Sequence, residues 1–205
     1  MAAPTPPTRD RVVDAAMRLF GERGYAATSI ADIESAAGLS PGSGSLYRHF
    51  ASKEALLMEG VRRRVSEGAA LRAALQNPPI EPVEPRVEYE AVVRAGLDRL
   101  DQDKDLSRMI NKDLRQFPAA LDLVRDDEIG AVHRAVASWL QARAPRPLDD
   151  RRAQALATAM VGAAANFWLL GDIFDEHPAG VTADELVDAI VSLIEAWLAG
   201  QTTLP

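Results

Sequence analysis

The chain has 205 residues, of which 47% are hydrophobic and 26% are charged, and its net charge is −7. This length and composition suit one or two globular domains rather than a disordered chain. Cysteine is absent, which excludes disulfides, thiolate metal sites and cysteine nucleophiles.

The charge is distributed unevenly along the chain. Residues 1–64 contain nine Lys and Arg and seven Asp and Glu, a balance of +2, which leaves −9 for the remaining residues. A net negative charge argues against nucleic-acid binding, but a mildly basic first part on an acidic body is typical of a DNA reader with a separate sensing domain. Two solvated surfaces of different composition would give the same balance.

The N-terminus begins with a short segment that has no helical pattern. Residues 1–8 (MAAPTPPT) lack the basic start and the apolar run of a signal peptide, so we expect a disordered arm and a cytoplasmic protein. Apolar residues at helical spacing then predict a helix from Thr8 to Arg23, which Gly24 ends.

Two short helical patterns follow between residues 28 and 53. Ser29 with Asp32 forms an approximate capping box, and Gly38 can take the positive φ of a sharp helix exit. Ser40 followed by Pro41 is a second start signal, a cap residue and then proline at the first helical position. Two short helices joined by a glycine-containing turn describe a helix-turn-helix.

At these residues the chain resembles the DNA-binding domain of the TetR (tetracycline repressor) family of transcription regulators. The resemblance covers roughly residues 9–60 and rests on GYAATSIADIESAAGLS and LYRHFASKEAL. It implies an all-α fold, with an N-terminal three-helix helix-turn-helix domain at 9–50 and a C-terminal helical bundle at 51–205. It also implies a homodimer that binds a palindromic operator in double-stranded DNA, usually as a repressor released by a small molecule.

The resemblance also assigns candidate DNA contacts. Hydroxyl and guanidinium groups at positions 43, 45, 47 and 48 are expected at base edges, and positions 28, 47, 49 and 53 are expected at phosphates. The complete predicted set is Thr28, Ser29, Ser43, Gly44, Ser45, Tyr47, Arg48, His49 and Lys53.

Two features depart from the family pattern. Seven residues (LSPGSGS) separate Gly38 from Leu46, where the family usually has about five. Glu34 stands where the family usually places a small alanine in the contact between the two helices. We expect the longer turn to let Glu34 point outward.

Further helices are predicted in the rest of the chain. A helix begins at Ser52 and continues to about Gln76, with Arg62, Arg63 and Arg64 on a solvated face. Four prolines in residues 77–85 predict a loop. Helical patterns then resume at about 87–100, 105–116 and 119–144, and no strand pattern is convincing.

The last two predicted helices carry the prediction of a dimer. Residues 155–171 contain no charge and are apolar on every side, but they are short for a membrane span, so we expect a buried helix. The helix at about 183–199 has two apolar stripes, of which one suffices for its own domain. The resemblance implies that both helices pair with a second copy, and the predicted interface is Val161, Ala165, Trp168, Leu186, Val187, Ile190, Val191, Leu193, Ile194, Trp197 and Leu198.

The effector site is predicted inside the C-terminal bundle by the same resemblance. Asn166 is an amide in an apolar run, which either a backbone group, a water or a ligand could satisfy, so a largely apolar effector with few polar groups is expected. The candidate residues are Met109, Phe117, Trp139, Met160, Asn166, Phe167 and Trp168.

No catalytic, metal-binding or cofactor-binding motif is present in the sequence. The alternative is an all-helical small-molecule-binding protein or enzyme that does not bind DNA, and it would treat the presence of Tyr47, Arg48, His49 and Lys53 as coincidence.

Overall fold

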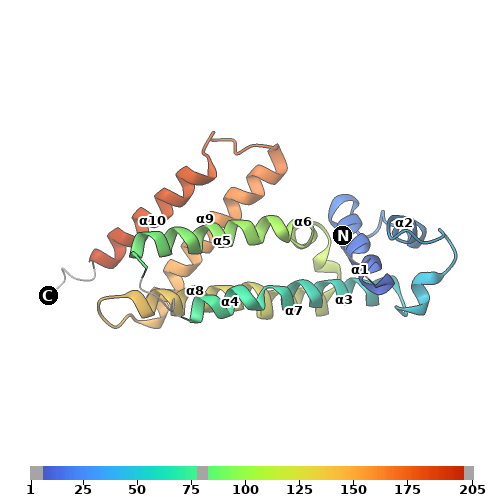
Figure 1. Ribbon diagram of the computed structural model, residues 1–205, viewed down its shortest axis with the longest axis horizontal. Coiled ribbons are helices and arrows are strands. Elements are labelled where there is room, and N and C mark those ends of the chain that lie inside the picture. The colour runs from blue at the N-terminus through green and yellow to red at the C-terminus, as the bar shows by residue number, and fades with distance from the viewer. Residues whose placement is uncertain (1–6, 78–82, 201–205) are drawn as a thin grey trace, which may run out of the picture. The chain divides into compact units, whose positions relative to one another are not determined.

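The structure is a computed structural model that describes residues 7–77 and 83–200. Within these ranges it contains helices and turns and no strand (Figure 1), which confirms the predicted all-α fold. Most of the predicted N-terminal arm and the middle of the predicted proline-rich loop, residues 1–6 and 78–82, lie outside the described residues. The chain divides into two compact units.

Unit 1 contains residues 7–67 and 103–127 of the described chain. Its helix α1 packs against α2, α3 and α6. Because α6 belongs to this unit, the first helices of the chain are completed by a segment that lies about 90 residues later in sequence. The elements of unit 1 are α1 (Thr8–Arg23), α2 (Ile30–Ala36), the 3₁₀ turn η1 (Ser45–Arg48), α3 (Lys53–Glu67), α6 (Lys104–Lys112), the 3₁₀ turn η2 (Leu114–Gln116) and α7 (Pro118–Leu123).

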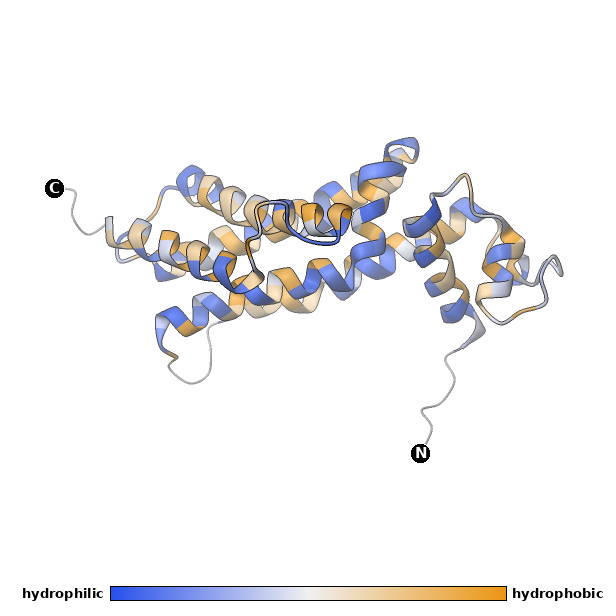
Figure 2. Cartoon of the chain, turned by 90° about the horizontal axis from the view of Figure 1, so that it is seen from above, coloured by the Kyte–Doolittle hydropathy of each residue, from blue (hydrophilic) through white to orange (hydrophobic). Residues whose placement is uncertain are grey.

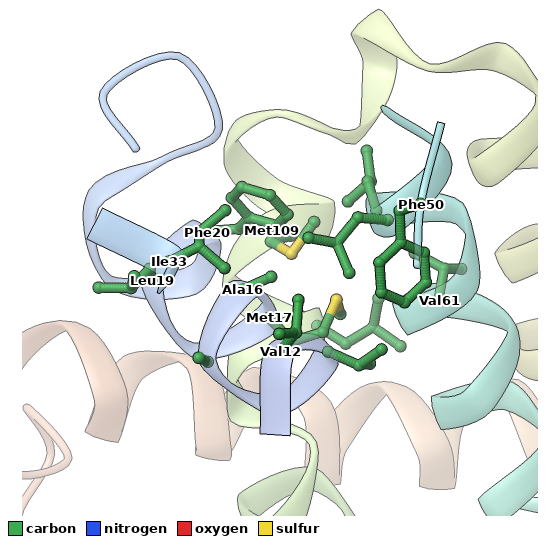
Figure 3. Packing of buried hydrophobic residues seen from close by; sticks show 14 of the residues in the cluster. Val12, Ala16, Met17, Leu19, Phe20, Ile33, Phe50, Val61 and Met109 are labelled. Atoms are coloured by element: carbon green, nitrogen blue, oxygen red, sulfur yellow. The ribbon is translucent and has the colours of Figure 1, made fainter. Parts of the chain in front are cut away.

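The core of unit 1 is built around one face of α1 (Figure 3). Phe20 and Met17 are fully buried there and lie among apolar side chains from α2, α3 and α6, including Ile33, Val61 and Met109. Burial of side chains of this size stabilises a fold by roughly 1.5–3 kcal/mol each. The predicted first helix is therefore confirmed with the same bounds, Thr8–Arg23.

Unit 2 contains the remaining helices, in which hydrophobic residues lie along some sides and hydrophilic residues along others (Figure 2). Helix α9 packs against α5 and α8, and α10 packs against α5. The second contact also has an ionic part, because Arg86 pairs with Asp188 and Glu195, and Arg94 pairs with Asp184. The elements of unit 2 are α4 (Ala69–Gln76), α5 (Pro85–Gln102), α8 (Gly130–Arg143), α9 (Asp150–Phe174) and α10 (Ala183–Gly200).

Several predicted helices are divided in the structure. Ser52 caps α3 as predicted, since its hydroxyl accepts the Ala55 N–H, but the helix expected to reach Gln76 is interrupted at Gly68. A Cβ at Gly68 would lie 2.6 Å from Arg72 Nη1 and 2.8 Å from Glu128 Oε2. The lack of a side chain there leaves room for the ion pair between Arg72 and Glu128. The helix predicted at 119–144 is interrupted by a π-helical stretch, η3 (Val124–Ile129).

The arginine run on α3 lies among acidic side chains. Arg63 pairs with Asp14 and Glu67, and Arg62 lies 4.0 Å from Glu59. Of the three residues predicted on a solvated face, Arg62 is exposed, whereas Arg63 and Arg64 are half-buried.

Helix α9 is not buried on all sides, contrary to the prediction. Within unit 2 it buries only the side that carries Ala153, Ala157, Met160 and Ala164. It is long and apolar enough to cross a membrane by length and composition, and only 17% of its most apolar window is buried. Its other sides are left largely uncovered by unit 2.

The predicted domains at 9–50 and 51–205 were defined by function, the first by DNA binding and the second by effector binding and dimerisation. This functional division stays a prediction. The compact units follow the packing of the chain instead. They differ from the predicted boundaries because α3, α6 and α7 belong to unit 1.

A close contact between α1 and α6 gives a test of this packing. A Cβ on Gly21 of α1 would lie 2.7 Å from the Cα of Asp105 on α6, and backbone cannot move as a side-chain tip can. We expect Gly21→Ala to lower the free energy of unfolding by about 1–3 kcal/mol. The matched control is Gly96→Ala in α5, where nothing lies within 4 Å and the change should raise stability by about 0.5–1 kcal/mol. Urea titrations that show equal effects for both variants would contradict the packing of α1 on α6.

Candidate nucleic-acid interface

Helix α2 begins and ends with the local signals that the sequence contains. The Ser29 hydroxyl accepts the Asp32 N–H at 3.1 Å, and the Asp32 carboxylate accepts the Ser29 N–H at 2.9 Å, which completes the predicted capping box. Hydrogen bonds from Ser29 lower the pKa of the Asp32 carboxyl. At the other end, Gly38 has φ +71° and donates to Ser35, while Leu39 donates to Glu34. These two bonds form the Schellman motif that ends a helix at glycine.

The predicted second helix does not start at Ser40 and Pro41. Residues 41–44 form a turn in which Gly42 and Gly44 have φ +72° and +70°, a left-handed conformation that an α-helix cannot contain. The helical part is the single 3₁₀ turn η1, Ser45–Arg48. The prediction was wrong because the cap and proline signals are outweighed by two glycines immediately after them.

Glu34 points inward, contrary to the prediction. Its side chain is 0% exposed, and Oε1 accepts the backbone N–H of Leu46 at 3.1 Å. Because the turn 41–44 is not helical, the carboxylate occupies the place of a helical acceptor for that N–H. The sequence shows the unusual acid, but no local signal identifies its partner twelve residues away.

Polar side chains project from η1 on a buried apolar base. Leu46 and Phe50 are buried in the core of unit 1, whereas Arg48 and His49 are exposed and Tyr47 is 57% exposed. The base is held further because the Arg9 guanidinium lies 5.1 Å from the centre of the Phe50 ring. The exposed groups can donate hydrogen bonds outward while their backbone stays fixed from behind.

The serines before η1 are also placed together. The Ser43 and Ser45 hydroxyls lie 2.5 Å apart, and the Ser45 N–H donates to the Ser43 hydroxyl. Ser29 is exposed at the start of α2. We call residues 43–49 the exposed turn, and it contains six of the nine predicted DNA contacts.

Lys53 lies at the start of α3, with its ammonium group directed at the turn between α1 and α2. Its Nζ donates to the Tyr25 carbonyl at 2.5 Å and lies 4.1 Å from the centre of the Tyr25 ring. Burial lowers the pKa of the Lys53 ammonium, and the charge of Asp113 opposes that shift. Asp113 also accepts the Tyr25 N–H at 2.8 Å. Sequence reasoning missed Asp113 because no pattern links it to a residue 88 positions earlier.

Thr28 is not available for the phosphate contact that was predicted for its side chain. It is 1% exposed, and its hydroxyl donates to the carbonyls of Leu19 and Gly24 at 3.2 and 2.9 Å. The side chain therefore closes the end of α1 instead.

The predicted effector residues are divided between the two units. Met109 and Phe117 belong to the core of unit 1, and Trp139 and Met160 belong to the core of unit 2. Asn166 is exposed on α9, so its amide needs no buried partner, and Phe167 and Trp168 are half-buried near the end of that helix.

The predicted dimer residues divide into two groups. The first group is buried within unit 2, so its side chains are not free to contact a second copy. Ile194, for example, is 0% exposed. This group comprises Val187, Ile190, Val191, Ile194 and Leu198. The second stays at least partly uncovered and comprises Val161, Ala165, Trp168, Leu186, Leu193 and Trp197. Leu193 is 67% exposed.

Within the described residues, no group of three or more His, Cys, Asp or Glu side chains is placed to hold a metal ion.

Comparison with known proteins identifies the N-terminal region. Residues 12–59 match the sequence model of the bacterial regulatory proteins of the tetR family. The chain is 50% identical over 54 residues to the transcriptional repressor KstR2 of Rhodococcus jostii and 46% identical over 50 residues to the transcriptional regulator YerO of Bacillus subtilis. These segments cover 26% and 24% of this chain, and 26% and 17% of the relatives. The chain thus matches about a quarter or less of the length of these curated relatives.

Solved structures resemble the whole chain. A TetR-like transcriptional regulator from Rhodococcus sp. RHA1 is 20% identical and has a TM-score of 0.69 over 97% of this chain and all of that one. A TetR regulator from Legionella pneumophila has a TM-score of 0.71 at 17% identity, over 95% of this chain and 99% of that one. The regulator FadR of Bacillus subtilis, solved in complex with stearoyl-CoA, has a TM-score of 0.62 at 17% identity, over 93% of this chain and 98% of that one. The helix-turn-helix region, residues 12–59, thus matches the tetR family of bacterial regulatory proteins in sequence, and the whole chain shares its fold with solved TetR regulators.

Proposed function

We propose that this protein is a cytoplasmic transcriptional regulator, a repressor, that binds a near-palindromic operator in double-stranded DNA and releases it in response to a small molecule. The observation that carries the proposal is the exposed turn, where Tyr47, Arg48 and His49 project from a backbone that Leu46 and Phe50 anchor in the core. The relatives matched over this region carry names of transcriptional regulators and repressors, which supports the same function.

The chemistry of the exposed turn suits double-stranded DNA. An arginine can donate two hydrogen bonds to one guanine edge, and serine hydroxyls can donate to or accept from several bases. Tyrosine and histidine donate to phosphate oxygens, which fix the register of a protein on the duplex. We assign Ser43, Ser45 and Arg48 to base edges, and Tyr47, His49 and Ser29 to the backbone.

We also assign Lys53 to DNA binding, through one N–H of its ammonium group. An ammonium has three N–H donors, and one of them is used by the Tyr25 carbonyl. We assign a remaining donor to a phosphate, so that Lys53 both holds the turn between α1 and α2 and contributes a charge to DNA binding.

The dimer is supported by the apolar surface that unit 2 leaves uncovered. Helix α9 exposes small uncharged residues over three turns, from Ala155 to Asn166, and its end exposes Ile173 and Phe174. On α10, Leu193 is exposed, and Leu186 and Trp197 pack against the core but stay partly uncovered. We propose that a second copy covers these surfaces, since small residues allow close approach of helices and the large ones supply apolar area.

The response to a small molecule is proposed for the helical part of the chain beyond the helix-turn-helix. The structural likeness to FadR, which was solved with stearoyl-CoA bound, supports an effector that contains a long apolar part. Such a ligand must change the affinity for DNA by the same factor by which DNA changes the affinity for the ligand. Displacement of labelled operator by apolar candidates tests this part.

The alternative function, an all-helical small-molecule-binding protein or enzyme without DNA binding, predicts no preference for any DNA sequence. Selection of bound sequences from a random duplex pool decides between the two. Recovery of one near-palindromic motif supports the regulator, and recovery of an unenriched pool contradicts it.

Arg48 should contribute sequence preference. We expect Arg48→Ala to cost about 1–3 kcal/mol at the base pair it reads and to relax discrimination there. The measurement is a competition assay with operators mutated one base pair at a time. Arg18→Ala, an exposed arginine on α1 that pairs with Glu22, is the matched control and should keep the parent's profile. If Arg48→Ala discriminated among the mutated operators as the parent does, Arg48 would not contact a base edge.

Lys53 should affect all DNA sequences alike. We expect Lys53→Ala to weaken operator and random DNA together and to reduce the slope of log K against log[salt] by about one unit, because one phosphate contact is lost. Titrations at several salt concentrations measure the slope. If affinity falls and the slope does not change, Lys53 acts only by holding the Tyr25 carbonyl.

The two neighbouring residues on α10 should behave differently when they are charged. Leu193 is 67% exposed, so Leu193→Asp should leave the monomer folded and convert dimers to monomers in sedimentation. Ile194 is 0% exposed, and Ile194→Asp should unfold unit 2 because it buries an unpaired charge. A folded dimer of the Leu193 variant would exclude this surface as the interface.

A further inference from the structure

Glu34 holds both ends of the segment that leads from α2 into the exposed turn. Its backbone carbonyl accepts the N–H of Leu39 at 2.8 Å, where the chain leaves α2. Its side-chain Oε1 accepts the N–H of Leu46 at 3.1 Å, where the chain enters η1. One residue therefore closes a segment of eight residues, 39–46, through two hydrogen bonds of different kinds.

The Leu46 N–H requires an acceptor from outside its own turn. In an α-helix this group would donate to the carbonyl four residues earlier, but residues 41–44 form a turn with two left-handed glycines. Leu46 is fully buried, so water does not readily replace the missing carbonyl. A buried donor without a partner is unfavourable, and the Glu34 carboxylate supplies the partner.

The position of Glu34 is not explained by stability alone. Its second carboxylate oxygen, Oε2, is buried and has no hydrogen-bond partner among the described residues. Buried acids with an unpaired oxygen are disfavoured in proteins, so such a group calls for a specific reason. The hydrogen bond to Leu46 is the contact that the side chain gains in return.

We infer that Glu34 is a positioning residue for DNA recognition. It fixes the position and orientation of the exposed turn and does not itself contact DNA. The inference rests on the proposed function. Tyr47 and Arg48 follow Leu46 directly, so a shift of the Leu46 peptide unit would displace both side chains from the groups they contact.

The test uses two variants at Glu34 and one control elsewhere in unit 1. Glu34→Met fills a similar volume but has no oxygen acceptor, and Glu34→Gln keeps one oxygen at the same reach. Val65→Ala removes buried apolar area from α3 in the same core and controls for a general loss of stability. Each variant is measured in the full chain, at a temperature where all of them are folded.

Two readouts are required, one without DNA and one with it. Amide hydrogen exchange of Leu46 in the free protein reports the hydrogen bond, and the ratio of operator to random-DNA affinity reports reading. For Glu34→Met we expect about tenfold faster exchange of Leu46 and about a tenfold loss in the affinity ratio, the effect of one lost hydrogen bond. Glu34→Gln should stay within about threefold of the parent in both, because the acceptor remains.

Three outcomes would overturn the inference. Unchanged Leu46 exchange in Glu34→Met would mean that the bond does not hold the turn. Faster exchange with an unchanged affinity ratio would mean that the bond does not affect reading. An equal loss of the ratio in Val65→Ala would mean that reduced stability is the cause. A parent protein that binds no operator would instead refute the proposed function, while the exchange result would still decide whether Glu34 holds the turn.

Discussion

The arrangement of unit 1 depends on how the backbone of one residue, Tyr25, is held between α1 and α2. Asp113 accepts its N–H and Lys53 donates to its carbonyl, so charged groups from the end of α6 and the start of α3 fix the same turn. The Tyr25 ring packs against Phe20 and Phe117. Because these contacts hold the turn at Tyr25, they set the direction of α2 relative to α1. The position of the exposed turn then depends on α2, because Glu34 of α2 binds the Leu46 N–H.

The parts of the fold that local rules control could be predicted from the sequence. Ser29 with Asp32, Gly38 and Ser52 mark helix ends correctly because each signal acts through hydrogen bonds to neighbours within four residues. The Ser40–Pro41 signal belongs to the same class and was wrong, because Gly42 and Gly44 admit a left-handed turn that competes with a helix. The contacts of Glu34 and Asp113 could not be predicted, since they join residues that only the tertiary fold brings together.

Periodicity predicted that α10 is apolar on two sides, but it could not say which side faces the chain's own core. The structure separates them: Val191 and Ile194 face α5 and its neighbours, and Leu193 remains exposed. Ion pairs contribute to this choice, because Asp184 and Asp188 on α10 lie against Arg94 and Arg86 on α5. The charges therefore fix the rotation of a helix whose apolar pattern alone would allow two orientations. Asn166 shows another limit of sequence patterns. An amide within an apolar run is predicted to be buried, but α9 buries only one of its sides and Asn166 lies on an exposed side.

The two departures from the family pattern have one physical explanation. A longer turn with two left-handed glycines takes the helical acceptor away from the Leu46 N–H, and a small alanine at position 34 could not replace it. Glutamate reaches that N–H from α2, so the acid is tolerated in the helix contact only because the longer turn leaves a donor there. Each departure alone would leave a buried group without a partner, the Leu46 N–H in one case and a whole carboxylate in the other. Together they satisfy the donor at the cost of one unpaired carboxylate oxygen.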